Sequence, residues 1–149
     1  MPSKPPGVPS TGSTVELHVE RCGPRGAVAV VGLAGEFDIE TVPLIDGFLR
    51  RVFGPFYHRH HVLLDLAGVT LVDSSFVSFL VGLVSRARGE GKDVVLARPS
   101  GQVRRTLLLV GLPNLVPVYE SLEEAVAVVA SGQVPLIPPV YPSRAPVGG

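Results

Sequence analysis

The chain lacks several features on which whole classes of protein depend. Its 149 residues include one cysteine, Cys22, and no tryptophan. A single cysteine cannot form an intrachain disulfide, which fits a reducing, intracellular setting. The sequence also places no histidine where it would activate Cys22 as a nucleophile. The N-terminus has no apolar stretch typical of a secretory signal, and no apolar run reaches the roughly 18 residues of a membrane span. We therefore expect a soluble, cytoplasmic protein with no membrane partner.

An excess of charge of either sign is also missing. Thirteen basic residues balance thirteen acidic ones, so no overall field would draw the chain to nucleic acid. Hydrophobic residues make up 46% of the chain, which is enough for a buried core. We predict a single domain over residues 14–132, between flexible proline-rich tails at 1–13 and 133–149. Such a tail could also be a ligand for an aromatic groove on another protein.

Apolar periodicity predicts an α/β domain. Strand-like and helix-like patterns alternate after an initial pair of strands joined by a Gly/Pro-rich turn. The predicted strands cover residues 15–21, 27–33, 61–66, 93–97 and 116–119, and the predicted helices begin at Thr41, Ser75, Ser100 and Ser121. This alternation favours a mixed, mainly parallel sheet of about five strands with about four helices. The first hairpin adds an antiparallel edge.

The motifs of several enzyme classes are absent. No Gly-x-Gly-x-x-Gly or Gly-x-x-x-x-Gly-Lys-Ser/Thr sequence could hold a nucleotide, and no Gly-x-Ser-x-Gly sequence indicates a hydrolase nucleophile. Three histidines precede the third strand, but no cysteine or second histidine pair lies at a metal-ligand spacing from His58, His60 and His61. We therefore expect no metal. Four arginines on the second and third helices could contact a partner or belong to a solvated face: Arg86, Arg88, Arg104 and Arg105.

Two acidic turns remain as candidates for function. One, Gly35–Asp38, follows the second strand, and the other, Asp73–Ser75, joins the third strand to an apolar-periodic helix. Asp and Ser commonly cap helices, so a purely structural role is the ordinary interpretation of the second turn. If the two strands are neighbours, both turns lie at the C-terminal edge of the sheet, where α/β proteins usually bind ligands and partners. The hydroxyl of Ser74 would then have an acidic frame made of Asp38, Asp73, Ser75 and Glu36.

Four motifs, in this order, make the chain similar to a known family. They are Leu33-Ala-Gly-Glu-Phe-Asp38, Val62-Leu-Leu-Asp-Leu-Ala-Gly-Val69, Val72-Asp-Ser-Ser75 and Gly111-Leu112. With them the chain resembles the STAS domains, in particular the anti-sigma factor antagonists, over nearly all of the segment from Val15 to Ala130. The resemblance implies a STAS-like fold and a non-enzymatic regulator of transcription.

The resemblance also implies a role for the site residues. In the family, the serine after the aspartate, here Ser74, is phosphorylated by an anti-sigma factor that is also an ATP-dependent serine kinase. Asp38 matches the acidic residue beside that serine. The unphosphorylated antagonist binds the anti-sigma factor and frees a sigma factor, phosphorylation breaks the complex, and a serine phosphatase restores it. ATP belongs to the kinase, so the chain is expected to need no cofactor of its own.

Phe76 departs from the family, which commonly has a glycine or another small residue two places after the phosphorylated serine. Its ring could anchor the first helical turn in the core, or it could crowd a kinase cleft. The second outcome favours a scaffold or sensor domain on the same fold that is never phosphorylated and docks a partner by shape. A third hypothesis, a small hydrolase or transferase with Ser74 as nucleophile, lacks a nearby histidine base and an oxyanion loop.

Overall fold

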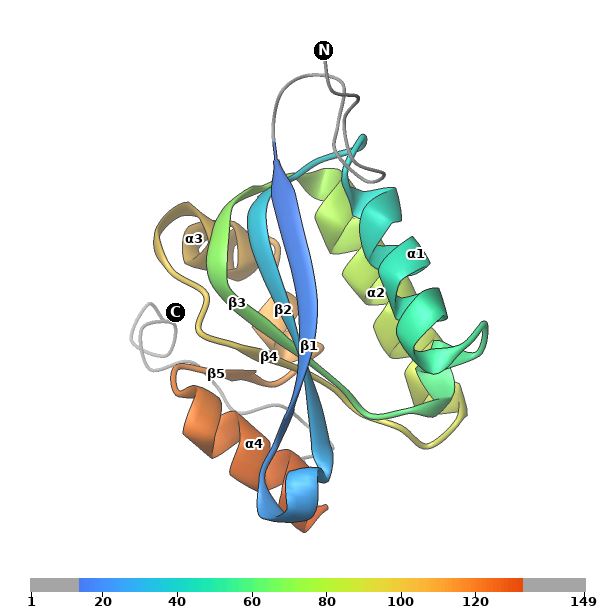
Figure 1. The fold of residues 1–149 in the computed structure, drawn as a ribbon. Helices are drawn as coiled ribbons and strands as arrows, with labels where there is room; N and C mark the ends of the chain where they lie inside the picture. Colours follow the sequence, from blue (N-terminus) through green and yellow to red (C-terminus); the bar gives the residue numbers. More distant parts are fainter. Residues whose placement is uncertain (1–13, 133–149) are drawn as a thin grey trace.

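The fold is a five-stranded mixed sheet with helices on both faces (Figure 1). The computed structural model describes residues 14–132, so both expected tails lie outside the described residues. The strands follow chain order across the sheet: β1 (Val15–Cys22), β2 (Val28–Phe37), β3 (Val62–Val72), β4 (Val94–Ala97) and β5 (Val118–Tyr119). Only the β1–β2 pair is antiparallel, and the other three pairs are parallel. The predicted fold class is confirmed.

Four α-helices cover the two faces of the sheet. They are α1 (Val42–Phe53), α2 (Ser74–Gly89), α3 (Gly101–Leu109) and α4 (Leu122–Ser131). The larger core joins side chains of α1, α2 and α3 to one face of the sheet, and a smaller core joins α4 to the other face (Figure 1). Successive β3 residues therefore enter different cores, Leu63 the smaller and Leu64 the larger. Burial on both faces explains why the first three residues of β3, Val62–Leu64, are all apolar.

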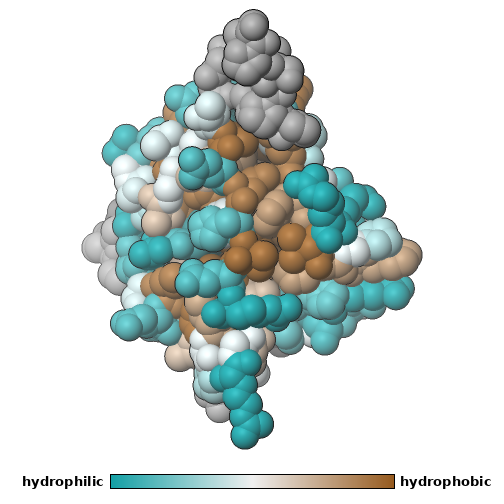
Figure 2. All heavy atoms as spheres, viewed as in Figure 1, coloured by the Kyte–Doolittle hydropathy of each residue, from teal (hydrophilic) through white to brown (hydrophobic). Residues whose placement is uncertain are grey.

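β1 is one of the two edge strands, and within residues 14–132 no strand pairs with its outer side. Its sequence alternates, so Val15 and Leu17 pack against the larger core while charged side chains, among them Glu16 and Glu20, are exposed. Figure 2 shows apolar side chains gathered over β1 and towards α1, bordered by hydrophilic ones. Charges on an edge strand oppose pairing with a second sheet.

Two strands run further than the sequence indicated. β2 continues to Phe37 rather than ending at residue 33, and β3 continues to Val72 rather than ending at residue 66. The parallel pairing of β2 and β3 continues through two register shifts. The two backbones approach so closely there that a Cβ on Gly68 would lie 2.7 Å from the Cβ of Ala34. Gly68, which lies beyond the predicted end of β3, is required there because its backbone packs closely against β2. As a consequence Glu36, expected in a turn, lies in β2.

Candidate functional site

The C-terminal ends of β2 and β3 lie side by side. Glu36 pairs with Leu71 and Phe37 with Val72, and the Asp73 backbone N–H donates a 3.2 Å hydrogen bond to the carbonyl oxygen of Phe37. Asp38 and Asp73 therefore follow adjacent strand ends at one edge of the sheet. The structure therefore shows that β2 and β3 are neighbours, which the sequence had left open.

Asp73 fixes the beginning of α2. Its carboxylate Oδ1 accepts hydrogen bonds from the backbone N–H groups of Ser75, at 2.8 Å, and Phe76, at 3.4 Å. These N–H groups have no partner within the helix, which is why an aspartate at this position stabilises the helix start. The predicted helix cap is therefore present, and Asp73 has the structural role expected of it.

Ser74 is the first residue of α2 and is exposed, whereas Ser75 is half-buried. Within the part of the chain that the structure describes, the Ser74 hydroxyl makes no hydrogen bond. A serine that served only to cap the helix would direct its oxygen to a backbone N–H, but Asp73 already does this. The Ser74 hydroxyl is thus accessible and uncommitted at the positive end of a helix.

Asp38 organises the turn before α1. Its Oδ1 accepts hydrogen bonds from the backbone N–H of Glu40, at 2.9 Å, and from the N–H of Thr41, at 3.1 Å. The sequence predicted that Thr41 caps α1, and this is wrong for its side chain, which makes no capping hydrogen bond to the helix. Instead Thr41 is buried, and its hydroxyl donates to the carbonyl oxygen of Glu36 at 2.9 Å and accepts from the N–H of Asp38 at 2.9 Å. Because Thr41 is buried under the turn, the side chain of Asp38 rather than that of Thr41 bonds to the backbone N–H groups ahead of α1.

Both carboxylates therefore have the same arrangement. In Asp38 and in Asp73, Oδ1 holds backbone N–H groups, and among the described residues Oδ2 accepts no hydrogen bond. Each side chain is half-buried and fixed in place with one oxygen left free. Glu36 is exposed next to them at the end of β2, so the four residues predicted to frame Ser74 all lie at this edge.

Phe76 packs into the core. Its side chain is 0% exposed, and its ring centroid lies 6.0 Å from that of Phe37. Of the two possibilities that the sequence left open for this ring, the structure shows the anchor of the first helical turn. The surface around Ser74 is therefore free of the Phe76 side chain.

Gln102 supports the site, and no sequence pattern indicated it. β4 pairs only with residues 62–65 of β3, so the far end of β3 has no strand on that side. There the Gln102 side chain accepts a hydrogen bond from the N–H of Val72, at 3.2 Å, and donates one to the carbonyl oxygen of Val72, at 3.3 Å. The amide replaces the missing strand directly before Asp73. No local pattern could reveal a contact that spans thirty positions.

We expect Gln102→Ala to lower the free energy of unfolding by about 1–3 kcal/mol. Val72 is buried, so the substitution leaves its N–H without a partner. Denaturant unfolding measures the effect, with the exposed Arg105→Ala in the same helix as control. Equal stability of the two variants would show that the amide does not support the end of β3.

Several of the other candidate side chains are engaged in local contacts. The His60 ring packs against Phe53 with ring centroids 5.3 Å apart, and His61 Nδ1 accepts a hydrogen bond from the backbone N–H of Asp93 at 3.2 Å. Arg88 donates to the carbonyl oxygen of Leu115, and Arg104 pairs with Glu120. Across residues 14–132, no group of three or more His, Cys, Asp or Glu side chains is arranged to hold a metal ion, and none of the helices has the length and apolar character to cross a bilayer.

Cys22 is not activated as a nucleophile. Burial raises the pKa of its thiol, and the negative charges of Glu20 and Asp65 raise that pKa further. The thiol, rather than the reactive thiolate, is therefore favoured at neutral pH.

Comparison with known proteins agrees with this geometry. A family model described as "Mlab, STAS domain" matches residues 23–117. A Thermotoga neapolitana protein named as an anti-sigma factor antagonist is 28% identical over 92 residues, which are 60% of this chain and 79% of that protein. The crystal structure of a Thermotoga maritima protein named in the same way is 27% identical, with a TM-score of 0.59 over 68% of this chain and 87% of that one.

A more distant structure shows the same fold. The anti-sigma factor antagonist SpoIIAA in its unphosphorylated form is 20% identical, with a TM-score of 0.61, and the match covers 78% of this chain and 97% of SpoIIAA. The family model spans more than half of the chain and agrees with the sheet order and the helices found here. The protein therefore belongs to the STAS domain family.

Proposed function

We propose that this chain is an anti-sigma factor antagonist that is switched off by phosphorylation of Ser74. In its unphosphorylated form it binds an anti-sigma factor that is also a serine kinase, and so releases a sigma factor for transcription. Phosphorylation breaks this complex, and a serine phosphatase restores it. The chain acts by binding rather than by catalysis, and ATP enters only through the kinase.

The observation that carries the proposal is the free hydroxyl of Ser74. It is exposed at the beginning of α2, and no described residue forms a hydrogen bond with it, because Asp73 already caps the helix. A phosphate there adds about −1.5 to −2 charge and three acceptor oxygens. The relatives named as anti-sigma factor antagonists supply the class of partner.

The surroundings of Ser74 also suit a protein partner. Ile39 follows Asp38 and is 75% exposed, and Leu71 near the end of β3 is 40% exposed. Exposed apolar side chains beside fixed polar groups are common where proteins bind each other. A partner that covers this edge would exclude water from the hydroxyl. A charge added there would therefore change the free energy of binding more than the same charge in water.

Incubation of the chain with ATP and an anti-sigma factor that co-purifies with it tests the proposal. We expect mass spectrometry to find one phosphate, on Ser74, and none in a Ser74→Ala variant, while Ser85→Ala, which changes an exposed serine further along α2, is phosphorylated normally. A partner that binds but leaves Ser74 unmodified would favour the alternative function, a scaffold or sensor domain that docks by shape. A phosphate on another residue would contradict the proposal.

A further inference from the structure

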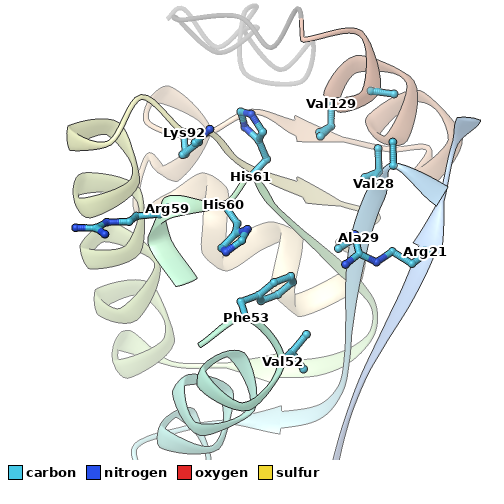
Figure 3. A pocket seen from close by; sticks show the side chains of 12 residues that line it. Arg21, Val28, Ala29, Val52, Phe53, Arg59, His60, His61, Lys92 and Val129 are labelled. Carbon is cyan, nitrogen blue, oxygen red and sulfur yellow. The ribbon is translucent and has the colours of Figure 1, made fainter. Parts of the chain in front are cut away.

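A cavity of about 410 Å³ opens at the end of the sheet opposite to Ser74 (Figure 3). It lies between the last turns of α1 and α4, next to His60 and His61, which directly precede β3. Ser74 follows the other end of β3, and eleven strand residues span roughly 35 Å. A role for this cavity therefore does not depend on the proposed function.

The wall of the cavity is mainly apolar. Seven of its twelve lining residues are apolar, among them Val52 and Phe53 of α1 and Val129 of α4. In Figure 3, Val129 lies on one side of the cavity, and Val52 and Phe53 lie on the other. Val52 is 37% exposed, so within residues 14–132 part of this apolar wall faces water.

The last described residues lie at the mouth of this cavity. α4 ends at Ser131, and Ala130, one residue earlier, lines the cavity. Gly132 follows in the left-handed conformation, with a φ of 71°, and its N–H donates to the carbonyl oxygen of Val129 at 3.2 Å. This conformation ends a helix and turns the chain away from the helix axis. The segment that follows Gly132 therefore starts beside the apolar wall.

The sequence of that segment is apolar. Seventeen residues follow Gly132, and the first eleven of them carry no charge. Residues 134–141 are Val-Pro-Leu-Ile-Pro-Pro-Val-Tyr, so large apolar side chains are interspersed with prolines. Prolines restrict the backbone in advance, which lowers the conformational entropy lost on docking. The N-terminal segment 1–13 differs, since its only large apolar residues besides proline are Met1 and Val8.

The reach of the C-terminal segment matches the cavity. An extended proline-rich chain advances about 3.1 Å per residue, so residues 134–137 can lie about 6–16 Å beyond Gly132. A compact cavity of about 410 Å³ is about 9 Å across, a distance that three residues of such a chain span. A connection this short holds the segment at an effective concentration of about millimolar. A weak contact is therefore sufficient to keep it docked.

The polar part of the lining suits the same segment. Proline has no N–H, so a proline-rich backbone presents more carbonyl acceptors than donors. Arg21 and Lys92 supply donors, and among the described residues that line the cavity none is acidic. The rings of Phe53 and His60, with centroids 5.3 Å apart, add an aromatic surface of the kind on which proline-rich segments dock.

We propose that residues 134–137 dock into this cavity of their own chain. The side chains of Leu136 and Ile137 lie against Val52 and Phe53, so that the segment joins the end of α4 to the end of α1 and covers the apolar wall. The occupant is this segment rather than a second molecule, because the chain enters the cavity directly from α4. The chain itself then closes the cavity to other ligands.

Nuclear magnetic resonance of the full chain tests the proposal. We expect nuclear Overhauser effects between the methyl groups of Leu136 or Ile137 and the ring protons of Phe53. A double variant, Leu136→Asp with Ile137→Asp, should shift the amide signals of Phe53 and Ala130, because two charged side chains cannot stay against an apolar wall. Val147→Asp, which adds a charge further along the same segment, should leave these signals unchanged.

The cavity wall provides a second test. Val52→Asp places a charge on the wall and should abolish the contact between Phe53 and the segment. Val81→Asp changes a similarly exposed valine of α2, 43% exposed against 37% for Val52, and should preserve the contact. Both positions are partly exposed, so both variants should stay folded, and their spectra show this directly.

Any of four results would overturn the proposal. They are the absence of contacts between residues 134–137 and the cavity wall, equal amide shifts in the double variant and in Val147→Asp, and an unchanged contact in Val52→Asp. The fourth is a contact that vanishes when the protein is diluted, which would place the segment of a second copy in the cavity. None of these results bears on phosphorylation of Ser74, which is tested by a different experiment.

Discussion

A Ser74→Glu variant is expected to bind the proposed anti-sigma factor partner about a hundredfold more weakly than the unmodified chain, without losing its fold. In the free protein, the helix N-terminus favours an exposed negative charge by about 0.3–1 kcal/mol. Carboxylates such as those of Asp38 and Asp73 oppose it by about 1 kcal/mol each at 4 Å in water. These effects roughly offset each other, so the thermal midpoint should change little.

In the proposed complex the same charge would meet a partner surface that binds the neutral Ser74 hydroxyl. Burying an unpaired charge against a partner costs several kcal/mol, and about 2.7 kcal/mol already corresponds to a hundredfold change in Kd. Isothermal titration calorimetry with the anti-sigma factor measures the loss. Ser74→Ala should bind normally, and Ser85→Glu, which adds the same charge at an exposed position about three turns along α2, should cause a much smaller loss. Equal affinities of the two Glu variants would contradict a specific role for position 74.

Phe76→Ala is expected to lower the free energy of unfolding by about 3–5 kcal/mol. The ring is fully buried and packs against Phe37, so its removal leaves a cavity in the larger core beneath the start of α2. A loss of this size is a large fraction of the stability of a domain of this length. Chemical denaturation measures it.

The same helix provides a control for this substitution. Val81 is 43% exposed, so Val81→Ala should change the stability by no more than about 0.5 kcal/mol. If Phe76→Ala cost under about 1 kcal/mol, the ring would not be the anchor that the structure shows. A phosphorylation defect in folded Phe76→Ala protein would then have to come from a direct contact between this ring and the kinase.

The start of α2 was predictable because helix capping is local. Asp73 bonds to residues two and three positions further on, so the Asp-Ser-Ser sequence before an apolar helix is sufficient to locate it. The same reasoning failed at Thr41. Which of two polar residues in a turn caps the helix depends on which one the fold buries, and here Thr41 is buried.

The ends of β2 and β3 were not predictable from pattern alone. Ala67 and Gly68 interrupt the run of large apolar residues in β3, and Gly35 interrupts that of β2, so both segments resemble loops in the sequence. Their pairing depends on two backbones that approach across glycine. The contact of Gln102 with Val72 was missed for a related reason, because it joins chain segments whose proximity only the folded sheet creates.

The most direct test is the affinity of the anti-sigma factor for the chain before phosphorylation, after stoichiometric phosphorylation of Ser74, and after removal of the phosphate by a serine phosphatase. We expect tight binding, then a loss of about a hundredfold or more, then full recovery, since the charge of phosphoserine exceeds that of glutamate. Equal affinity in all three states would show that the exposed hydroxyl of Ser74 does not control this interaction.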